Sequence, residues 1–293
     1  MVRLGAWRWP ATVAALIIVF LAIILPVAAI AARALTQTLG AGIAWSNFTL
    51  ENVMAVVSLH TLAGTALLHS LAYALIAALI ACVAALLLSI ELDRSRRLMR
   101  PVVLGISLGA VAIPGIVLGF GYILLWNRLP GFRDWPFPHY GESSLLVTGY
   151  AAAALPYCLI VILAAIGQLA PSLSEAARLQ GAGPAARLMR ITLPLILLSV
   201  VTAFLLTFIR TIFELPLSQL LIPLSGSPLP PVVIRLFNHD GDGLAAALSL
   251  VGMIVAGGGA ALVWFMASRA LPRRIGPEAS MARWPSASAG DPA

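Results

Sequence analysis

Six long apolar stretches constrain this chain more than any other feature of its sequence. A bilayer core of roughly 30 Å is crossed by about 20 apolar helical residues, and lipid tolerates only helices or closed barrels. None of the six shows the short alternating pattern of a barrel strand. Residues 1–293 are therefore predicted to form an all-α, polytopic membrane bundle in one domain. The predicted spans are residues 11–33, 64–90, 101–126, 144–167, 193–222 and 244–268.

The arginines are distributed in a way that orients these spans. A formal charge of +7 could by itself indicate a nucleic-acid partner. The basic residues instead gather in alternate connections, and placing both termini in the cytoplasm leaves 13 of the 18 there, as the positive-inside rule requires. The sequence thus predicts that the chain is embedded in a lipid bilayer and does not bind nucleic acid. The cytoplasmic set is Arg3, Arg8, Arg94, Arg96, Arg97, Arg100, Arg178, Arg187, Arg190, Arg269, Arg273, Arg274 and Arg283.

The first span also fits a second interpretation. Arg3 and Arg8 precede an apolar run that contains Ala29-Ile30-Ala31, a pattern that could mark a cleaved signal peptide. The run is long enough to cross a bilayer, and the basic connections are better explained if it stays, so the prediction keeps it as a span. At the other end of the chain, residues 275–293 are polar and are predicted to be disordered.

The connection between the fourth and fifth spans, residues 171–192, does not look like a plain turn. Ser172 or Ser174 can cap a first short helix, with Glu175 in the first turn, where the helix dipole favours an acid. Gly181 can adopt the left-handed conformation that ends a helix. The pattern therefore predicts a short helix that stops at Gly181.

A second short helix is predicted directly after it, because Gly183 and Pro184 can restart the chain as a helix. The small side chains of Ala176 and Ala177 would let the backbone of another protein lie close. Charge is offered to such a partner by Arg178, Arg187 and Arg190. Two helices joined at a sharp turn between two spans form an elbow that could transmit force.

The same segment carries a specific signature: Glu-Ala-Ala, three residues, Gly, nine residues, then Ile-x-Leu-Pro. It is formed by Glu175, Ala176, Ala177, Gly181, Ile191, Leu193 and Pro194. In this the chain resembles the permeases of binding-protein-dependent ABC importers. In that family the segment docks into a groove of the ATPase subunit. The resemblance implies the same coupling role here, and extends it to Arg178, Ala182, Gly183 and Arg187.

The resemblance also implies partners and a location. It implies a multi-pass subunit of a bacterial inner membrane that works with an ATPase dimer, an external substrate-binding protein and a second permease half, which is either a copy of this chain or another permease. ATP and Mg²⁺ would be bound by the ATPase. The chain contains no lysine, so it lacks the residue that ends a phosphate-binding loop. No catalytic or metal-ligand constellation is apparent, and the prediction is a transporter subunit that is not an enzyme and holds no cofactor.

Weaker patterns point to one branch of the family. Residues 48–52, 113–119 and 208–216 look like those of permeases for ferric iron, thiamine or related small solutes. Members of that branch often fuse two six-span halves in one chain, whereas this chain has one half. We therefore expect a second half, and an iron-like or thiamine-like solute.

Two places at membrane depth are candidates for the translocation path. Pro114 interrupts the third span beside Gly115 and Gly119, which can equally be explained by close helix packing. Arg210 and Glu214 lie four residues apart, so on one helix face they could form an ion pair. The pair could be structural, could simply reach the outer interface, or could line the path together with Gln219.

Other functions were weighed against the importer. A secondary transporter driven by an ion gradient would use Arg210 and Glu214 as buried charges, and would have inverted repeats but no use for the signature segment. An intramembrane enzyme would need paired polar groups at membrane depth. Cys82 and Cys158 lie within spans and are predicted to be packing residues, neither disulfide-bonded nor metal-bound. The aromatic connection at residues 127–143 is either an interfacial belt or a docking surface.

Overall fold

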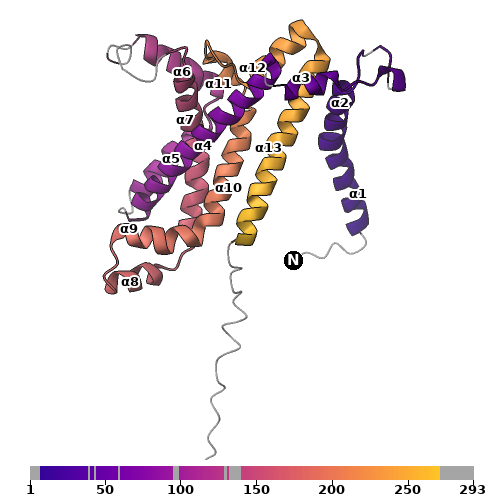
Figure 1. The fold of residues 1–293 in the computed structure, drawn as a ribbon. Helices are drawn as coiled ribbons and strands as arrows, with labels where there is room; N and C mark the ends of the chain where they lie inside the picture. Colours follow the sequence, from indigo (N-terminus) through magenta and orange to yellow (C-terminus); the bar gives the residue numbers. More distant parts are fainter. Residues whose placement is uncertain are drawn as a thin grey trace, which may run out of the picture.

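The computed structural model describes residues 7–270, except for 39, 43, 59, 95–98, 129–130 and 132–139. Within this part the chain is a bundle of helices (Figure 1). The described residues form no strand beyond an isolated β-bridge between Thr36 and Phe48. The predicted all-α class is confirmed. The predicted disordered tail, residues 275–293, lies outside the described residues.

The described part of the chain contains helices of very different lengths. In chain order they are α1 (Arg8–Val19), α2 (Leu25–Ala34), α3 (Glu51–Val57), α4 (Leu62–Arg94), α5 (Met99–Val111), α6 (Gly115–Arg128), α7 (Ser143–Ile166), α8 (Pro171–Leu179), α9 (Pro184–Arg187), α10 (Leu193–Ile212), α11 (Pro216–Leu220), α12 (Leu229–Arg235) and α13 (Asp242–Ala270). A 3-10 turn, η3 (Trp45–Asn47), precedes α3, and a π-helical turn, η5 (Leu236–Asp240), follows α12. Two further π-helical turns, η2 (Phe20–Ile24) and η4 (Leu188–Thr192), join α1 to α2 and α9 to α10, so each pair forms one long helix.

Five helices in the described residues are long and apolar enough to cross a membrane. They are Arg8–Ala34, Leu62–Leu92, Ser143–Ile166, Pro184–Ile212 and Asp242–Arg269. Four of them reproduce the predicted first, second, fourth and sixth spans to within a few residues. The chain is therefore a multi-pass membrane protein, and the remaining two predicted spans need correction.

The predicted third span, residues 101–126, is not one straight helix. It is a pair of helices, α5 and α6, bent by 101° at the break that contains Pro114. Before the break, Ala112 and Ile113 donate to the carbonyls of Gly109 and Ala110, which tightens the last turn of α5. Pro114 has no N–H to continue the helix, and its own carbonyl accepts from Val117 and Leu118 at the start of α6. The break at Pro114 is as predicted, while the sharp bend is not.

The helix observed at the predicted fifth span, residues 193–222, begins earlier and ends earlier than predicted. The observed helix runs from Pro184 to Ile212 without interruption, so it includes the second half of the predicted elbow. It ends at Ile212 because Pro216 cannot donate to the Ile212 carbonyl and its ring obstructs the preceding turn. Arg210 therefore lies on α10, whereas Glu214 lies in the break before α11.

The connections fall at two ends of the bundle as the arginine pattern predicts. In Figure 1 the start of α1, the short helices α8 and α9, and the last turn of α13 all lie at the lower end, called here the elbow end. Helices α3, α11 and α12 lie at the upper end. Gly181, between α8 and α9, is thus at the end opposite to the η5 turn that contains Asp240. Arg96 and Arg274, two of the arginines predicted to be cytoplasmic, lie outside the described residues.

The bundle core forms where α4, α7 and α10 pack together. On α4 the buried face consists of small residues, including Ala74, Ala77, Ala81 and Ala85, each at most 1% exposed. Small side chains allow membrane helices to approach closely, which is how helices associate when lipid is as apolar as the core. Small residues on α4 thus let the three helices approach closely, and larger buried side chains such as Leu159 and Ile162 on α7 and Ile196 on α10 complete the core.

Cys82 and Cys158 belong to this core, as expected for small packing residues. Their Sγ atoms are 3.3 Å apart, and both thiols are free and buried. Cys158 also lies 3.6 Å from the hydroxyl of Thr207 on α10. The two cysteines thus mark the point at which the three core helices meet.

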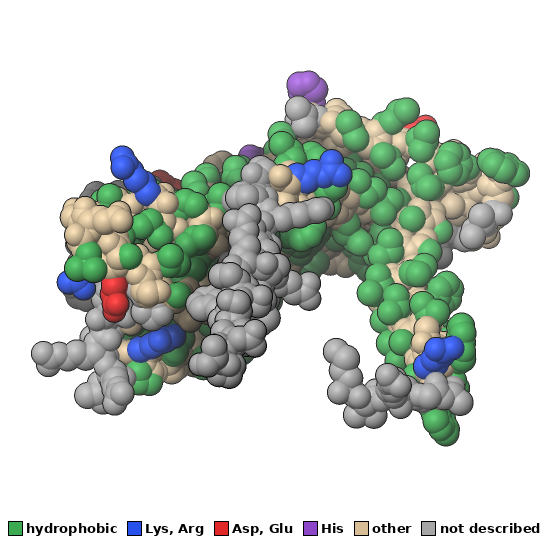
Figure 2. Space-filling model, turned by 90° about the horizontal axis from the view of Figure 1, so that it is seen from below, with side chains coloured by type: hydrophobic (Ala, Val, Ile, Leu, Met, Phe, Trp, Pro, Cys, Tyr) green, Lys and Arg blue, Asp and Glu red, His purple; other side chains and the backbone are tan. Residues whose placement is uncertain are grey.

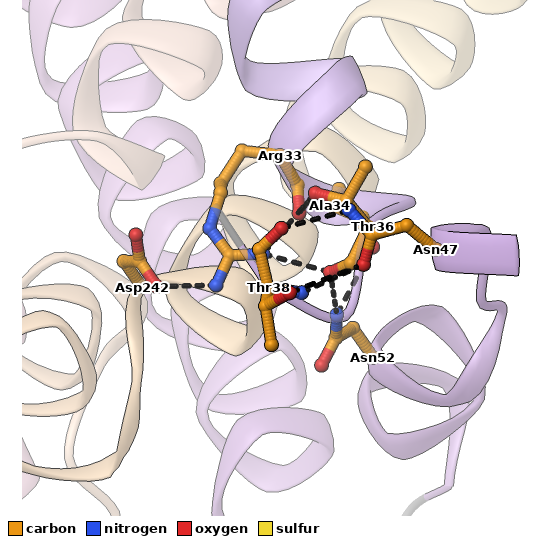
Figure 3. Close-up of polar contacts among 7 residues, drawn as sticks. All are labelled: Arg33, Ala34, Thr36, Thr38, Asn47, Asn52 and Asp242. Atoms are coloured by element: carbon orange, nitrogen blue, oxygen red, sulfur yellow. Dashed lines mark hydrogen bonds and ion pairs between the residues drawn. The ribbon is translucent and has the colours of Figure 1, made fainter. Parts of the chain in front are cut away.

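A polar clasp joins the first span to the last span at the upper end (Figure 3). Arg33, near the end of α2, forms an ion pair with Asp242, the first residue of α13. The same guanidinium donates to the carbonyl of Thr36 at 2.7 Å, and Asn52 from α3 donates to the carbonyl of Ala34 at 3.2 Å. We call this group the Arg33 clasp and the upper end of the bundle the clasp end.

The Arg33 clasp is expected to stabilise the protein modestly. The two charged side chains are 18% and 33% exposed, so the ion pair is expected to contribute about 1 kcal/mol. Arg33→Ala and Asp242→Ala should each lower the melting temperature of the purified protein by roughly 3 °C. The double variant should lose little more, because both substitutions remove the same interaction.

Thermal unfolding in detergent, followed by circular dichroism, would measure these shifts. Arg235→Ala is the matched control, since Arg235 is an exposed arginine on α12 at the same end of the bundle. Equal shifts for Arg33→Ala and Arg235→Ala would show that the clasp does not stabilise the fold.

Candidate coupling and translocation sites

The predicted elbow is present in the structure. Helix α8 ends at Leu179, and Gly181 follows with a φ of +77°, the left-handed conformation that ends helices. The N–H of Ala182 donates to the carbonyl of Ala177 at 3.0 Å, which closes the turn. Gly183 is extended, and α9 begins at Pro184. The first short helix and the role of Gly181 in ending it are therefore confirmed, whereas the second predicted short helix is the start of a longer one.

The start of α8 differs from the prediction. Neither Ser172 nor Ser174 caps the helix, because it already begins at Pro171, and Glu175 lies beyond its first turn. Proline has a fixed φ suited to the first helical position and needs no hydrogen bond for its nitrogen there, so it starts the helix ahead of the serines. Ser174 instead accepts a hydrogen bond from Nη1 of Arg187 at 3.1 Å, which ties α9 back to α8.

The elbow is continuous with the fifth span. Leu193 donates its N–H to the carbonyl of Leu188, five residues back, in the π-helical turn η4 that contains Ile191. Pro194 follows immediately, and the wider turn accommodates a proline that cannot donate to the preceding turn. A single helix of 29 residues, Pro184–Ile212, therefore connects the elbow to the break at Glu214.

The signature residues face in different directions. Glu175, Ala176 and Arg178 are exposed, whereas Ala177 is buried against its own chain. Ala177 is therefore too enclosed to offer a partner protein the close approach that its size suggested. Its small side chain instead allows α8 to lie against the rest of the elbow.

One exposed residue of the elbow was missed by the sequence analysis. Leu179, the last residue of α8, is 90% exposed although it lies outside the predicted spans. Its apolar surface is available to a partner protein, beside the exposed charge of Arg178. Its place between Arg178 and Gly181, in a segment otherwise rich in charge and small residues, is the signal that could have identified it.

The two helix breaks, at Pro114 and at Glu214, meet in space. A Cβ added to Gly115 would lie 2.5 Å from an Oε of Glu214. A Cβ added to Gly119 would lie 3.0 and 3.2 Å from the side chains of Leu220 and Leu217. Helix α6 thus packs directly on the segment that carries Glu214 and α11. The structure brings together Gly115, Gly119 and Glu214, three of the predicted path residues, and we call this contact the break junction.

The predicted ion pair between Arg210 and Glu214 is wrong. The pairing rule for residues four apart holds only on a continuous helix, and α10 ends between them. Arg210 instead places its guanidinium 4.1 Å from the ring centre of Tyr157, a cation–π contact. Gln219 is exposed on α11. Neither Arg210 nor Gln219 is part of the break junction.

Glu214 finds other partners in place of the arginine. One Oε accepts a hydrogen bond from the backbone N–H of Leu217 at 3.1 Å, which caps the first turn of α11. The other lies against Gly115 at the N-terminus of α6, where the helix dipole favours an anion. Its backbone carbonyl accepts from Ser218, which also shares a hydrogen bond with the buried Tyr150. The carboxylate is half-buried and held mainly by backbone groups.

With this geometry in place, comparison with known proteins is informative. The family described as "binding-protein-dependent transport system inner membrane component" matches residues 81–275. The chain belongs to this family. Members of this family are inner-membrane components of binding-protein-dependent transport systems, so the family prediction made from the signature is confirmed.

Curated relatives of this permease match about half of it. It is 28% identical over 149 residues to a spermidine/putrescine transport system permease protein PotC homolog of Mycoplasma pneumoniae, covering 48% of each chain. It is 26% identical over 151 residues to the homolog of Mycoplasma genitalium, covering 49% of each. The match spans about half the length of these relatives. Neither is named for iron or thiamine, so the predicted branch is not confirmed.

Solved structures show the same fold. An ABC transporter involved in the import of the acidic polysaccharide alginate superposes with a TM-score of 0.69 at 17% identity, covering 90% of this permease and 96% of that chain. The inward-facing MetNI methionine ABC transporter superposes with a TM-score of 0.58 at 18% identity, covering 71% and 95%. At this level of identity the likeness concerns the fold alone.

Proposed function

We propose that this permease forms the translocation path of an ATP-driven importer in a bacterial inner membrane. In this proposal it passes a small solute from an external binding protein and is driven by an ATPase dimer that binds ATP and Mg²⁺. The observation that carries the proposal is the continuous helix Pro184–Ile212, which joins the elbow to the break junction. A movement of the ATPase at the elbow would be carried along this helix to Ile212, two residues before Glu214.

A second permease half is part of the proposal, and the position of the first span supports it. The helix Arg8–Ala34 has no buried residue in its most apolar window, and it leans away from the bundle in Figure 1. It contacts the rest of the described chain mainly at the clasp end, where α2 and α3 meet α13. A projecting helix of this kind can pack against a second permease half. A copy of this chain or another permease would serve.

The solute is proposed to be a small cation. The relatives named for spermidine and putrescine favour a polyamine over ferric iron or thiamine. The half-buried carboxylate of Glu214 at the break junction is a suitable group for a passing cation to meet. Uptake of radiolabelled spermidine, ferric iron and thiamine by cells that express the complete transporter would decide among them. Uptake of thiamine or iron alone would overturn the polyamine choice.

Leu179 offers a direct test of the coupling role. Leu179→Glu places a charge where an apolar contact with the ATPase is proposed, so it is expected to reduce copurification of the ATPase by about tenfold or more. The substitution should leave the permease folded, because the side chain is almost fully exposed.

The matched control is Leu224→Glu, since Leu224 is 96% exposed and follows α11 near the clasp end. Both variants are purified with the tagged ATPase at equal expression. Equal retention of the ATPase by the two variants would contradict the assignment of the elbow as the coupling element.

A further inference from the structure

A cavity of about 630 Å³ lies behind the elbow, between the ends of α4 and α7 on one side and α8 with α9 on the other. This volume is in the range of small-molecule sites, about 300–1,000 Å³. Ile90 and Ile166 line it where α4 and α7 leave the membrane-spanning part of the bundle. The cavity therefore lies at the boundary between the apolar layer and water.

Charge in this cavity is one-sided. Among the described residues, Arg100, Arg178 and Arg187 line it, and Glu175 supplies the one carboxylate. Figure 2, seen from below, shows basic side chains at several places on the lobe formed by the elbow end, with acidic surface beside them. One carboxylate among three guanidinium groups leaves an excess of positive charge that a further anion would balance. The elbow end thus offers a site for a negatively charged group.

One of the arginines that line the cavity, Arg187, is not fully satisfied by the described chain. Nη1 of Arg187 donates to Ser174, but its Nε is buried and has no acceptor among the described residues. A buried donor without an acceptor costs free energy, which an anionic oxygen would relieve. Nη2 of Arg100 lies 3.6 Å from the position that a Cβ on Gly167 would occupy, so this glycine leaves room for the guanidinium.

We propose that this cavity, which we call the arginine cavity, binds the phosphate group of an anionic phospholipid headgroup. Guanidinium groups match phosphate oxygens in geometry and charge. Basic pockets between helices on the cytoplasmic side of a membrane are suited to anionic headgroups. The apolar wall formed by Ile90, Ile166 and Leu169 gives the glycerol and the first acyl carbons a surface to contact. A lipid bound there would hold α8 and α9 against the bundle.

Native mass spectrometry of the full chain in detergent tests the proposal. The protein is titrated with phosphatidylglycerol and, separately, with phosphatidylcholine, which carries no net charge. The wild-type chain is expected to retain one phosphatidylglycerol molecule at about tenfold lower concentration than phosphatidylcholine. The variant with Arg100→Gln and Arg187→Gln together should lose this preference. Arg187→Lys, which keeps the charge, should retain part of it.

Arg190→Gln is the matched control, because Arg190 is an exposed arginine of the same segment that does not line the cavity. It should bind phosphatidylglycerol as the wild type does. Hydrogen exchange should show lipid-dependent protection of the α8 and α9 amides in both the wild type and Arg190→Gln. Circular dichroism checks that each variant remains folded.

Three results would overturn the proposal. They are equal binding of the two lipids by the wild type, equal loss in Arg190→Gln and in the double variant, and protection confined to other helices. Displacement of phosphatidylglycerol by millimolar inorganic phosphate would support a phosphate site but overturn the lipid as its occupant. None of these measurements involves the ATPase or transport, so failure here leaves the proposed function untouched.

Discussion

Gly181→Val is expected to reduce solute uptake by about tenfold or more at equal expression. Gly181 has a φ of +77°, a conformation that costs a residue with a side chain roughly 1–2 kcal/mol, and more when the side chain is branched at Cβ. A strain of that size changes the population of the native elbow by a factor of about 5 to 30. The cause is the backbone conformation, because a Cβ on Gly181 would meet nothing within 4 Å. Uptake by cells with the complete transporter is the measurement.

Two controls separate backbone strain from other effects of the substitution. Gly181→Asn should keep most of the activity, since asparagine tolerates the left-handed conformation better than other residues. Gly183→Ala should behave as wild type in the same elbow, because Gly183 has a φ of −67° and open space around its Cβ position. Normal uptake by Gly181→Val would remove the elbow from the coupling mechanism.

Gly115→Ala is expected to lower uptake by about tenfold without preventing assembly with the ATPase. The added Cβ would lie 2.5 Å from an Oε of Glu214, so the carboxylate must move away from the N-terminus of α6. The end of a glutamate side chain is flexible, and the fold should therefore survive. If the carboxylate meets the solute, Glu214→Gln should have an effect of similar size.

The combination of Gly115→Ala and Glu214→Gln should be little worse than either change alone, because both act on one carboxylate. Gly121→Ala on the same helix is the control, since its Cβ position is open. A variant with the two charges exchanged, Arg210→Glu with Glu214→Arg, should transport no better than a variant that lacks the Glu214 carboxylate. The reason is that the two side chains form no ion pair in the described structure. Normal uptake by both Gly115→Ala and Glu214→Gln would leave the break junction with a packing role only.

Local rules explain which parts of the fold were predictable. The elbow follows from Gly181 and Pro184, residues whose preferred backbone conformations act within one turn. The predicted start of α8 was wrong because two local signals compete there, a proline that can begin a helix and serines that can cap one. Pro171 comes first in the chain, and the helix begins with it. The angle between α5 and α6 could not be predicted, since length and hydropathy are the same for a straight and a bent pair.

Both local and long-range effects explain the remaining differences. The Arg210–Glu214 pair does not form because Pro216 ends α10 at Ile212, between the two residues. Gly115 and Glu214 each stood out in the sequence, but nothing local brings α6 onto α11. The burial of Ala177 depends likewise on how α8 folds back, which its small size permits but does not dictate.

The Arg33 clasp bears on the biogenesis of the protein. Its two charged partners are 209 positions apart in the chain, so Asp242 leaves the ribosome long after the first span has entered the membrane. Until then Arg33 has no carboxylate partner, and the first span is not fastened to α13. Nascent chains or truncated products that stop before Asp242 would therefore expose an unfastened first helix. A membrane protease could recognise such a helix as the mark of an unfinished subunit.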